Sequence, residues 1–107
     1  MTTALLTHTD CLQHQTPDGH PERVARLERV LHALEPLDLQ RVTAPLAAED
    51  DILRVHPADY LSEIRQKSPS AEAVALDADT WMSPGSLHAA FRAAGAAVRA
   101  VLVACSL

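Results

Sequence analysis

The sequence predicts a helix-dominated α/β structure, and three observations lead to this prediction. Two short apolar runs, residues 4–7 and 39–43, have the length and composition of buried strands. Between and after them, apolar residues recur at helical spacing. With 107 residues the chain has room for one domain at most, and with 3% aromatic residues its core must consist of Ala, Leu and Val.

The first strand, residues 4–7, is expected to lead into a long polar loop. A helix is predicted over residues 21–35, because apolar side chains recur there every three or four residues: Val24, Leu27, Leu31 and Leu34. Pro21 suits the first helical position, where its missing N–H costs nothing. Pro36 ends the helix because a residue that precedes proline is disfavoured in helical geometry.

The middle of the chain predicts one strand and two short helices. After the strand at residues 39–43, helices are expected over residues 47–55 and 58–66, and Pro57 can open the second. Residues 73–76 are expected to be extended, and the polar residues 77–80 to form a turn.

The longest predicted helix covers residues 84–104. Ser83 and Pro84 suit the N-cap and first helical positions. Its polar residues His88, Arg92 and Arg99 line one narrow stripe, so the remaining circumference must be packed. Two or three short strands cannot cover such a helix. The chain is therefore expected to be the front part of a larger α/β domain, with a contiguous apolar patch on this helix.

Charge and composition bear on possible partners and location. The net charge of −5 and the pI near 5.6 predict that the chain does not bind nucleic acid. The most apolar stretch, residues 93–105, is cut by Arg99 and predicts a buried helix and no membrane span. Two cysteines and the absence of a basic n-region before the first apolar run predict a cytoplasmic protein.

One cluster has the residue types of a zinc site. His8, Cys11 and His14 recur every three residues, with Asp10 and His20 nearby. No second group of ligands follows downstream, since the other three histidines are isolated in the sequence. A polar loop, or a loop that lines a pocket, is the alternative to a small metal site.

Two other sets of charged residues have alternative interpretations. Arg23, Arg26 and Arg29 recur every three residues and could hold an anion, or simply form a solvated helix face. Asp77 and Asp79 could act as a carboxylate pair, but alternate residues of an extended segment point in opposite directions, so at most one of them faces a pocket.

The order of several motifs resembles a known family. The chain contains Thr7-His8-Thr9-Asp10-Cys11-Leu12 with His14, then Asp18-Gly19-His20-Pro21-Glu22-Arg23 with Arg26-Leu27. Three further segments follow in order, at residues 52–61, 76–80 and 83–96. This succession resembles the amino-terminal signature of the histone deacetylase superfamily, and in particular the bacterial histone-deacetylase-like and acetylpolyamine amidohydrolases.

The resemblance implies the amino-terminal part of an arginase/deacetylase-like three-layer α/β/α domain with a parallel sheet, incomplete over residues 1–107. It also implies a zinc-dependent hydrolase that acts on acetyl-lysine or acetylated polyamines, with zinc polarising the acetyl carbonyl and its bound water. The family's zinc ligands, catalytic His pair and oxyanion Tyr follow the region that this sequence matches. No catalytic or metal-binding residue is therefore expected in this chain.

What the resemblance carries over concerns substrate binding. It implies that His20 and Pro21 lie on the first rim loop of the substrate channel. Arg26 corresponds to an arginine that lines an internal cavity near the foot of the pocket. Asp77, or with less support Asp79, corresponds to an aspartate that contacts the substrate backbone. Each also has a plain structural interpretation: Pro21 as a first helical residue, Arg26 as a solvated side chain and Asp77 as a turn former.

Three functions therefore remain open from the sequence. The first is the amino-terminal portion of a zinc-dependent deacetylase, inactive on its own. The second is a non-catalytic helical interaction module that associates with another chain through the apolar final helix. The third is a small metal-binding protein that uses His8, Cys11 and His14.

Overall fold

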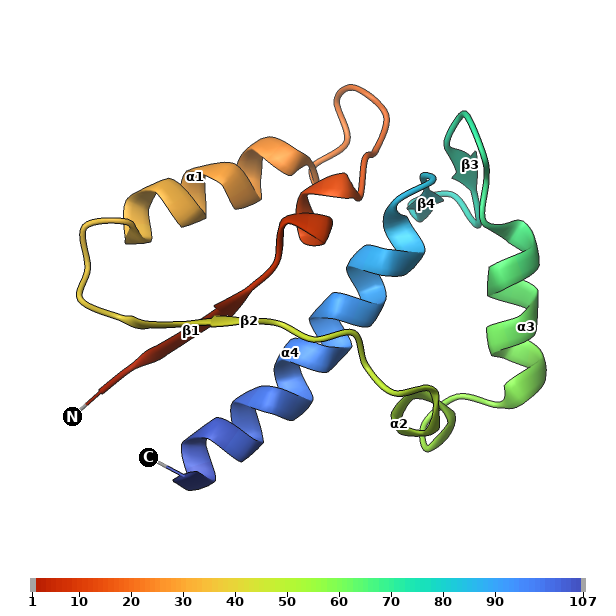
Figure 1. The fold of residues 1–107 in the computed structure, drawn as a ribbon. Coiled ribbons are helices and arrows are strands. Elements are labelled where there is room, and N and C mark those ends of the chain that lie inside the picture. The colour runs from red at the N-terminus through yellow and green to blue at the C-terminus, as the bar shows by residue number, and fades with distance from the viewer. Residues whose placement is uncertain (1, 107) are drawn as a thin grey trace.

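A computed structural model describes residues 2–106 and shows a mixed α/β fold (Figure 1). The predicted fold class is therefore confirmed. The elements in chain order are β1 (Ala4–Thr7), the 3-10 helix η1 (Thr9–Gln13), α1 (Val24–Leu34), β2 (Gln40–Thr43), α2 (Glu49–Leu53), α3 (Ala58–Lys67), β3 (Val74–Ala75), β4 (Trp81–Met82) and α4 (Ser86–Ser106).

Strands β1 and β2 form a parallel pair connected through α1, which is a β-α-β unit. Leu5 pairs with Arg41 and Thr7 pairs with Thr43. The backbone N–H of Ala44 donates to the carbonyl of Thr7 at 2.9 Å and extends the pairing beyond the strand ends. Both predicted strands are confirmed, and β2 begins one residue later than expected.

Helix α1 begins at Val24, so the prediction that Pro21 occupies its first position was wrong. The backbone of Glu22 is used by the preceding loop: its N–H donates to His20 Nδ1 at 3.1 Å, and its carbonyl accepts a hydrogen bond from the Thr16 hydroxyl. Arg23 then has an extended conformation, with φ −157°, and acts as the N-cap. The loop contacts delay the start of the helix.

Helix α4 begins at Ser86, two residues later than predicted. Pro84 and Gly85 form a turn, in which the N–H of Ser86 donates to the carbonyl of Ser83 at 3.0 Å. The hydroxyl of Ser83 does not cap the helix, because it bonds to the backbone of Gln13 and Gln15. The assignment of Ser83 and Pro84 to the N-cap and first helical positions was therefore wrong.

The middle elements agree with the prediction apart from their lengths. Helix α3 extends one residue beyond the predicted end, whereas α2 spans only Glu49–Leu53 of the nine residues expected to be helical. Strand β3 lies within the segment predicted to be extended, and residues 77–80 form the turn that leads to β4. Strand β4, which pairs with β3 in an antiparallel hairpin, was not predicted.

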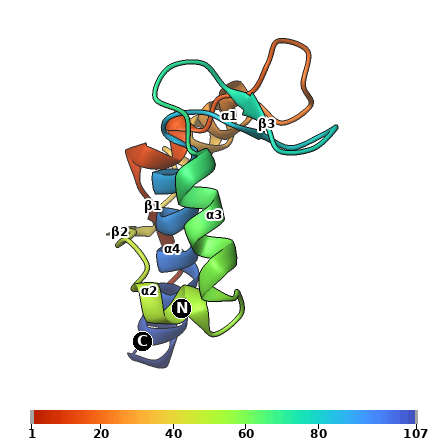
Figure 2. The same cartoon turned by 90° about the vertical axis from the view of Figure 1, so that its right-hand side faces the viewer.

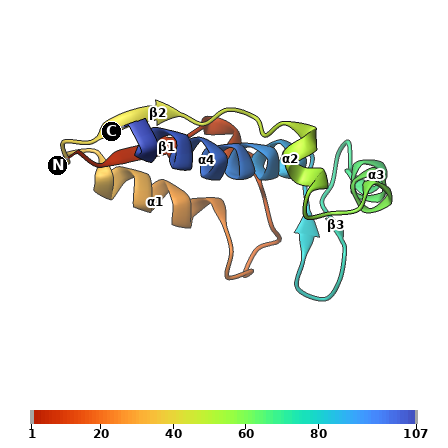
Figure 3. The same ribbon diagram turned by 90° about the horizontal axis from the view of Figure 1, so that it is seen from below.

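Helix α4 is the centre of the structure. It packs against β1 and η1, and it separates α1 from α2 and α3 (Figure 1 and Figure 3). In the view of Figure 2, α3 lies in front of α4. Gly95 lets the segment 45–47 approach the helix closely, where the N–H of Ala47 donates to the carbonyl of Phe91 at 2.9 Å. The buried apolar side chains are, apart from Met82, of the types that the composition predicts: Ala44, Ala47, Leu61, Met82, Ala89 and Val103.

The carboxyl-terminal half of α4 is largely uncovered. Val98 is 42% exposed, Val101 63% and Leu102 56%. The expectation that residues 93–105 form a buried helix was therefore wrong for this chain, whereas the predicted apolar patch on α4 is present. With 21 residues, α4 is also long and apolar enough to cross a membrane, a test that core helices of water-soluble proteins pass as well. The sequence estimate of 13 apolar residues was too short because it omitted the first turns of the helix.

An ion pair fixes the first half of α4 to the start of the chain. Arg92 Nε donates to Asp10 Oδ2 at 2.9 Å, and Arg92 Nη1 donates to the carbonyl of Ala44 at 3.0 Å. The hydrogen bond from Arg92 is the main cause that lowers the pKa of Asp10, and the nearby charge of His8 acts in the same direction. One side chain thus connects α4, η1 and the end of β2.

This ion pair predicts a specific dependence of stability on pH. Because the folded protein lowers the pKa of Asp10, its contribution is complete above the ordinary value of 3.8 and is lost as the pH falls through the folded value. We expect Asp10→Asn to be less stable than the wild type near neutral pH, and the difference to shrink in acid. Thermal unfolding from about pH 7 to about pH 3 measures this. Asp50→Asn, at an exposed position, is the control, and a difference that stays constant with pH would contradict the assignment.

Candidate functional site

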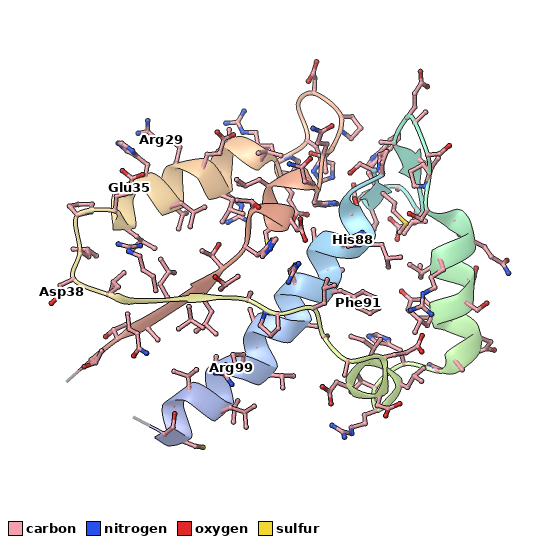
Figure 4. The ribbon with its side chains drawn as sticks, in the orientation of Figure 1. Arg29, Glu35, Asp38, His88, Phe91 and Arg99 are labelled. Atoms are coloured by element: carbon pink, nitrogen blue, oxygen red, sulfur yellow. The ribbon has the colours of Figure 1, made fainter. Side chains whose placement is uncertain are left out.

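A cavity of about 800 Å³ opens beside α4. Its walls come from α1, α3, the β3–β4 hairpin and α4 itself, and they are mainly apolar: Leu27, Leu61, Ile64, Leu76, Trp81 and Phe91. Figure 4 shows Phe91 directed from α4 toward α3. Apolar concave sites with a few polar groups are typical ligand sites, and we therefore take this cavity as the candidate site.

Polar side chains reach the cavity from the loop that follows η1. His14 Nδ1 lies 2.6 Å from the hydroxyl oxygen of Ser86, and His14 Nε2 lies 3.8 Å from Glu22 Oε2. All three residues line the cavity, and Ser86 is buried. The Ser86 hydroxyl also accepts a hydrogen bond from the backbone N–H of Ser83 at 2.7 Å. His14 is therefore held in one orientation between two elements.

The buried side chain of Ser83 anchors the same loop. Only 2% of this residue is exposed. Its hydroxyl accepts from the N–H of Gln15 at 3.0 Å, and lies 3.1 Å from the carbonyl of Gln13, to which it donates. Buried backbone groups of this kind need partners, because leaving them unpaired costs free energy. The loop is thereby fixed to the start of α4.

The four predicted substrate-binding residues lie in different places. Arg26, an exposed residue of α1, is among the residues that line the cavity. His20 and Pro21 lie within two residues of the lining residue Glu22, and Asp77 follows the lining residue Leu76, but among residues 2–106 these three do not belong to the lining themselves. Their roles toward a substrate stay predictions. Of the other predicted anion-binding arginines, Arg23 and Arg29 are exposed on α1 or at its start, which agrees with a solvated face (Figure 4).

Asp77 organises the hairpin turn. Its Oδ1 accepts hydrogen bonds from the N–H groups of Asp79 and Thr80, both at 2.9 Å. The bond from the Asp79 backbone is the largest cause that lowers the pKa of Asp77, and the bonds from Thr80 add to it. Asp77 is thus a charged turn former, which does not prevent its second oxygen from meeting a substrate. Asp79 is exposed.

His20 connects the two loops at the opening. Its Nε2 lies 2.9 Å from the carbonyl oxygen of Asp79, a residue 59 positions away in the sequence. The loop that follows η1 and the hairpin turn therefore meet through this side chain. Glu22 from one loop and Trp81 from the other line the cavity.

Comparison with known proteins identifies the family. Residues 20–106 match the family model described as the histone deacetylase domain. The chain belongs to the histone deacetylase family. This confirms the family indicated by the motifs from His20 onward.

Curated relatives in this family come from distant organisms. A histone deacetylase-like amidohydrolase of Pseudomonas aeruginosa is 38% identical over 87 residues, which cover 78% of this chain and 23% of that protein. A probable deacetylase of Methanothermobacter thermautotrophicus is 33% identical over 98 residues, covering 90% of this chain and 29% of that protein. The chain thus spans less than a third of the length of these relatives.

A solved member supports the deacetylase fold. The HD domain of HDA15 superposes with a TM-score of 0.76 at 22% sequence identity, covering 88% of this chain and 29% of that structure. The arginase/deacetylase fold implied by the motifs is confirmed. The β-α-β unit and α4 of this chain thus match one portion of that solved structure.

The family is generally zinc-dependent, so we tested whether the residues of this chain fit a zinc ion. Nowhere in residues 2–106 do three His, Cys, Asp or Glu side chains come together as a set that could hold a metal. His8 Nδ1 accepts from the N–H of Asp10 at 2.9 Å, and His14 is bonded to Ser86. These donors do not fit a zinc site, and no catalytic step through zinc follows from them.

Sequence reasoning missed the pairing of His14 with Ser86 and the role of Ser83 at the loop. The two partners of the His14–Ser86 bond are separated by 72 positions, and nothing in their local sequence connects them. Ser83 and Ser86 both lie at the start of a helix that the sequence clearly predicts, and at such positions a capping role is the simpler interpretation. Trp81 was also missed as a cavity residue, although a single Trp is a usual candidate for a pocket wall.

Proposed function

We propose that this chain forms the amino-terminal part of a deacetylase domain that hydrolyses the amide bond of acetylated amines. The observation that carries the proposal is the family match over residues 20–106, in a chain that spans less than a third of its relatives. In this role the chain supplies a wall and the rim of the substrate site. The catalytic zinc and its ligands belong to the remainder of the domain.

The shape of the molecule supports the proposal that this chain forms only part of the domain. Its radius of gyration is 15.3 Å, whereas a compact domain of this length has a value of about 13 Å. The excess reflects a flat molecule, 42 × 33 × 20 Å, with an open cavity and an uncovered face on α4. Val98, Val101 and Leu102 would gain cover from the remaining strands and helices, and each buried apolar side chain stabilises the assembly by about 1.5–3 kcal/mol.

The substrate class we propose is acetyl-lysine in a peptide or an acetylated polyamine, and neither nucleic acid nor a membrane is a proposed partner. The apolar wall near Leu27 and Trp81 suits the methylene chain that both substrates carry. We propose a cytoplasmic location, since Cys11 and Cys105 are both free thiols, as in a reducing compartment.

The isolated chain provides a first test. We expect the purified 107 residues to show no turnover of acetyl-lysine peptide or acetylated polyamine with added zinc, and to retain no stoichiometric zinc after dialysis. Mixed with the remainder of the Pseudomonas relative, beyond its matched segment, the chain should raise turnover above that of the remainder alone. Turnover by the chain alone that chelation abolishes would place the catalytic site within these residues and contradict the proposal.

The alternative from the sequence, a helical interaction module, shares one observation with this proposal, the exposed face of α4. The same mixture separates the two functions. Binding to the remainder without any gain in turnover favours an interaction module, whereas a gain in turnover favours the deacetylase. Zinc held tightly by the isolated chain without turnover would favour the metal-binding protein instead.

A further inference from the structure

Two loops meet at the opening of the cavity, and each is stiff by itself. The first follows η1 and is fixed at its base by the buried hydroxyl of Ser83. Near its tip, the N–H of His20 donates to the carbonyl of Pro17 at 3.1 Å, across a turn that contains Gly19 with φ +86°. A positive φ favours glycine, so this turn sets the position of His20.

The second loop is the hairpin turn between β3 and β4. Asp77 Oδ1 accepts from two backbone N–H groups, and the N–H of Leu76 donates to the carbonyl of Thr80 at 2.8 Å. These bonds leave the carbonyl of Asp79 free to accept from outside the turn. His20 Nε2 lies 2.9 Å from that oxygen.

The two partners of the His20 ring define its hydrogen-bonding roles. Nε2 faces the carbonyl oxygen of Asp79, which can only accept, so in the neutral ring the proton is on Nε2. Nδ1 then accepts from the N–H of Glu22 at 3.1 Å, which is shorter than its 3.3 Å distance from the Glu22 carbonyl oxygen. Nε2 therefore donates to the carbonyl of Asp79. Both ring nitrogens are used, one within the first loop and one between the loops. The side chain is half-buried, which restricts its rotation.

We propose that His20 is a positioning residue that latches the two rim loops together and thereby sets the width of the opening to the cavity. Glu22, two residues after His20, and Trp81, two residues after Asp79, both line the cavity, so the contact between the loops constrains their separation. The effect on activity that we expect rests on the proposed function. A narrow opening favours an extended acylated chain, so loss of the His20 contact weakens substrate binding without altering the chemical step.

The latch can be tested on the 107-residue chain without any activity. We expect His20→Ala to accelerate amide hydrogen exchange about fivefold at Glu22, which loses its acceptor, and at Asp79 and Thr80 in the opposite loop. His20→Gln, whose side-chain amide can reach the same carbonyl, should restore slow exchange at Asp79 and Thr80. Asp18→Asn, an exposed change on the same loop, is the control.

Two results would contradict the proposal that His20 holds the two loops together. Faster exchange at Glu22 alone, with Asp79 and Thr80 unchanged, would show that His20 only orders its own loop. Uniform acceleration along the whole chain in both the Ala and the Gln variants would show a global stabilising role. Either conclusion is independent of whether the domain is a deacetylase.

A second measurement connects the latch to function. In a single chain that joins all 107 residues to the remainder of the Pseudomonas relative beyond its matched segment, His20→Ala should raise KM roughly threefold or more with little change in kcat. His20→Gln should lie close to the unmodified protein. A decrease in kcat as large as the expected rise in KM, with KM itself unchanged, would contradict a positioning role for His20. If the joined chain has no turnover at all, the proposed function fails while the exchange result still decides the latch.

Discussion

Replacing Gly95 by alanine is expected to be the most damaging single substitution in this chain. A Cβ atom at this position would lie 1.9 Å from the carbonyl oxygen of Pro45 and 2.9 Å from the backbone nitrogen of Ala47. These are backbone atoms, and they cannot move without breaking the hydrogen bond from the Ala47 N–H to the Phe91 carbonyl. The contact therefore has to open, separating the segment after β2 from α4.

Two opposing effects determine the size of the loss. Alanine is the better helix former by about 1 kcal/mol, which favours the substitution. Overpacking a close contact costs about 1–3 kcal/mol, and more when backbone must shift. We expect a net loss of about 2 kcal/mol, which lowers the melting temperature by roughly 10 °C in a domain of this size.

The matched control for this prediction lies two residues further along α4. Ala97 is exposed, so Ala97→Gly should follow helix propensity alone and cost about 1 kcal/mol. Thermal unfolding of both variants, followed by circular dichroism, compares them directly. A Gly95→Ala protein that melts at or above the wild-type temperature would show that the segment 45–47 does not pack closely on the helix.

Much of the fold was predictable because local signals agree with the final structure. The strand β1 has the predicted ends, and α3 differs by one residue, because proline and apolar periodicity mark their boundaries within the sequence itself. The parallel pairing of β1 and β2 follows from the helix between them. Such features depend on residues close together in the chain.

The starts of α1 and α4 were predicted too early for one physical reason. In both cases residues that suit a helix start make hydrogen bonds outside the helix: Glu22 with His20 and Thr16 of its own loop, and Ser83 with the distant residues Gln13 and Gln15. Capping preferences describe an isolated helix and contain no information about such partners. These hydrogen bonds, local at α1 and long-range at α4, override them.

In the candidate site, too, the contacts between residues far apart in the sequence were the ones that the sequence did not predict. Arg26 lines the cavity, and the role that the family resemblance implies for it stays a prediction. The bonds of His14 to Ser86 and of His20 to Asp79 join residues 72 and 59 positions apart, respectively. Neither is visible in a local pattern. The exposure of Val101 was predictable in outline, because two short strands cannot cover a 21-residue apolar helix.

The most direct test of the account is the activity of a joined protein. In the histone deacetylase-like amidohydrolase of Pseudomonas aeruginosa, the segment matched over 87 residues is replaced by the corresponding residues of this chain. The same exchange with Gly95→Ala is the control for folding, and the unmodified relative is the reference. The account predicts turnover of acetyl-lysine peptide within about tenfold of the relative, and a marked loss with Gly95→Ala. A joined protein that folds and binds as much zinc as the relative, yet has no measurable turnover, would contradict it.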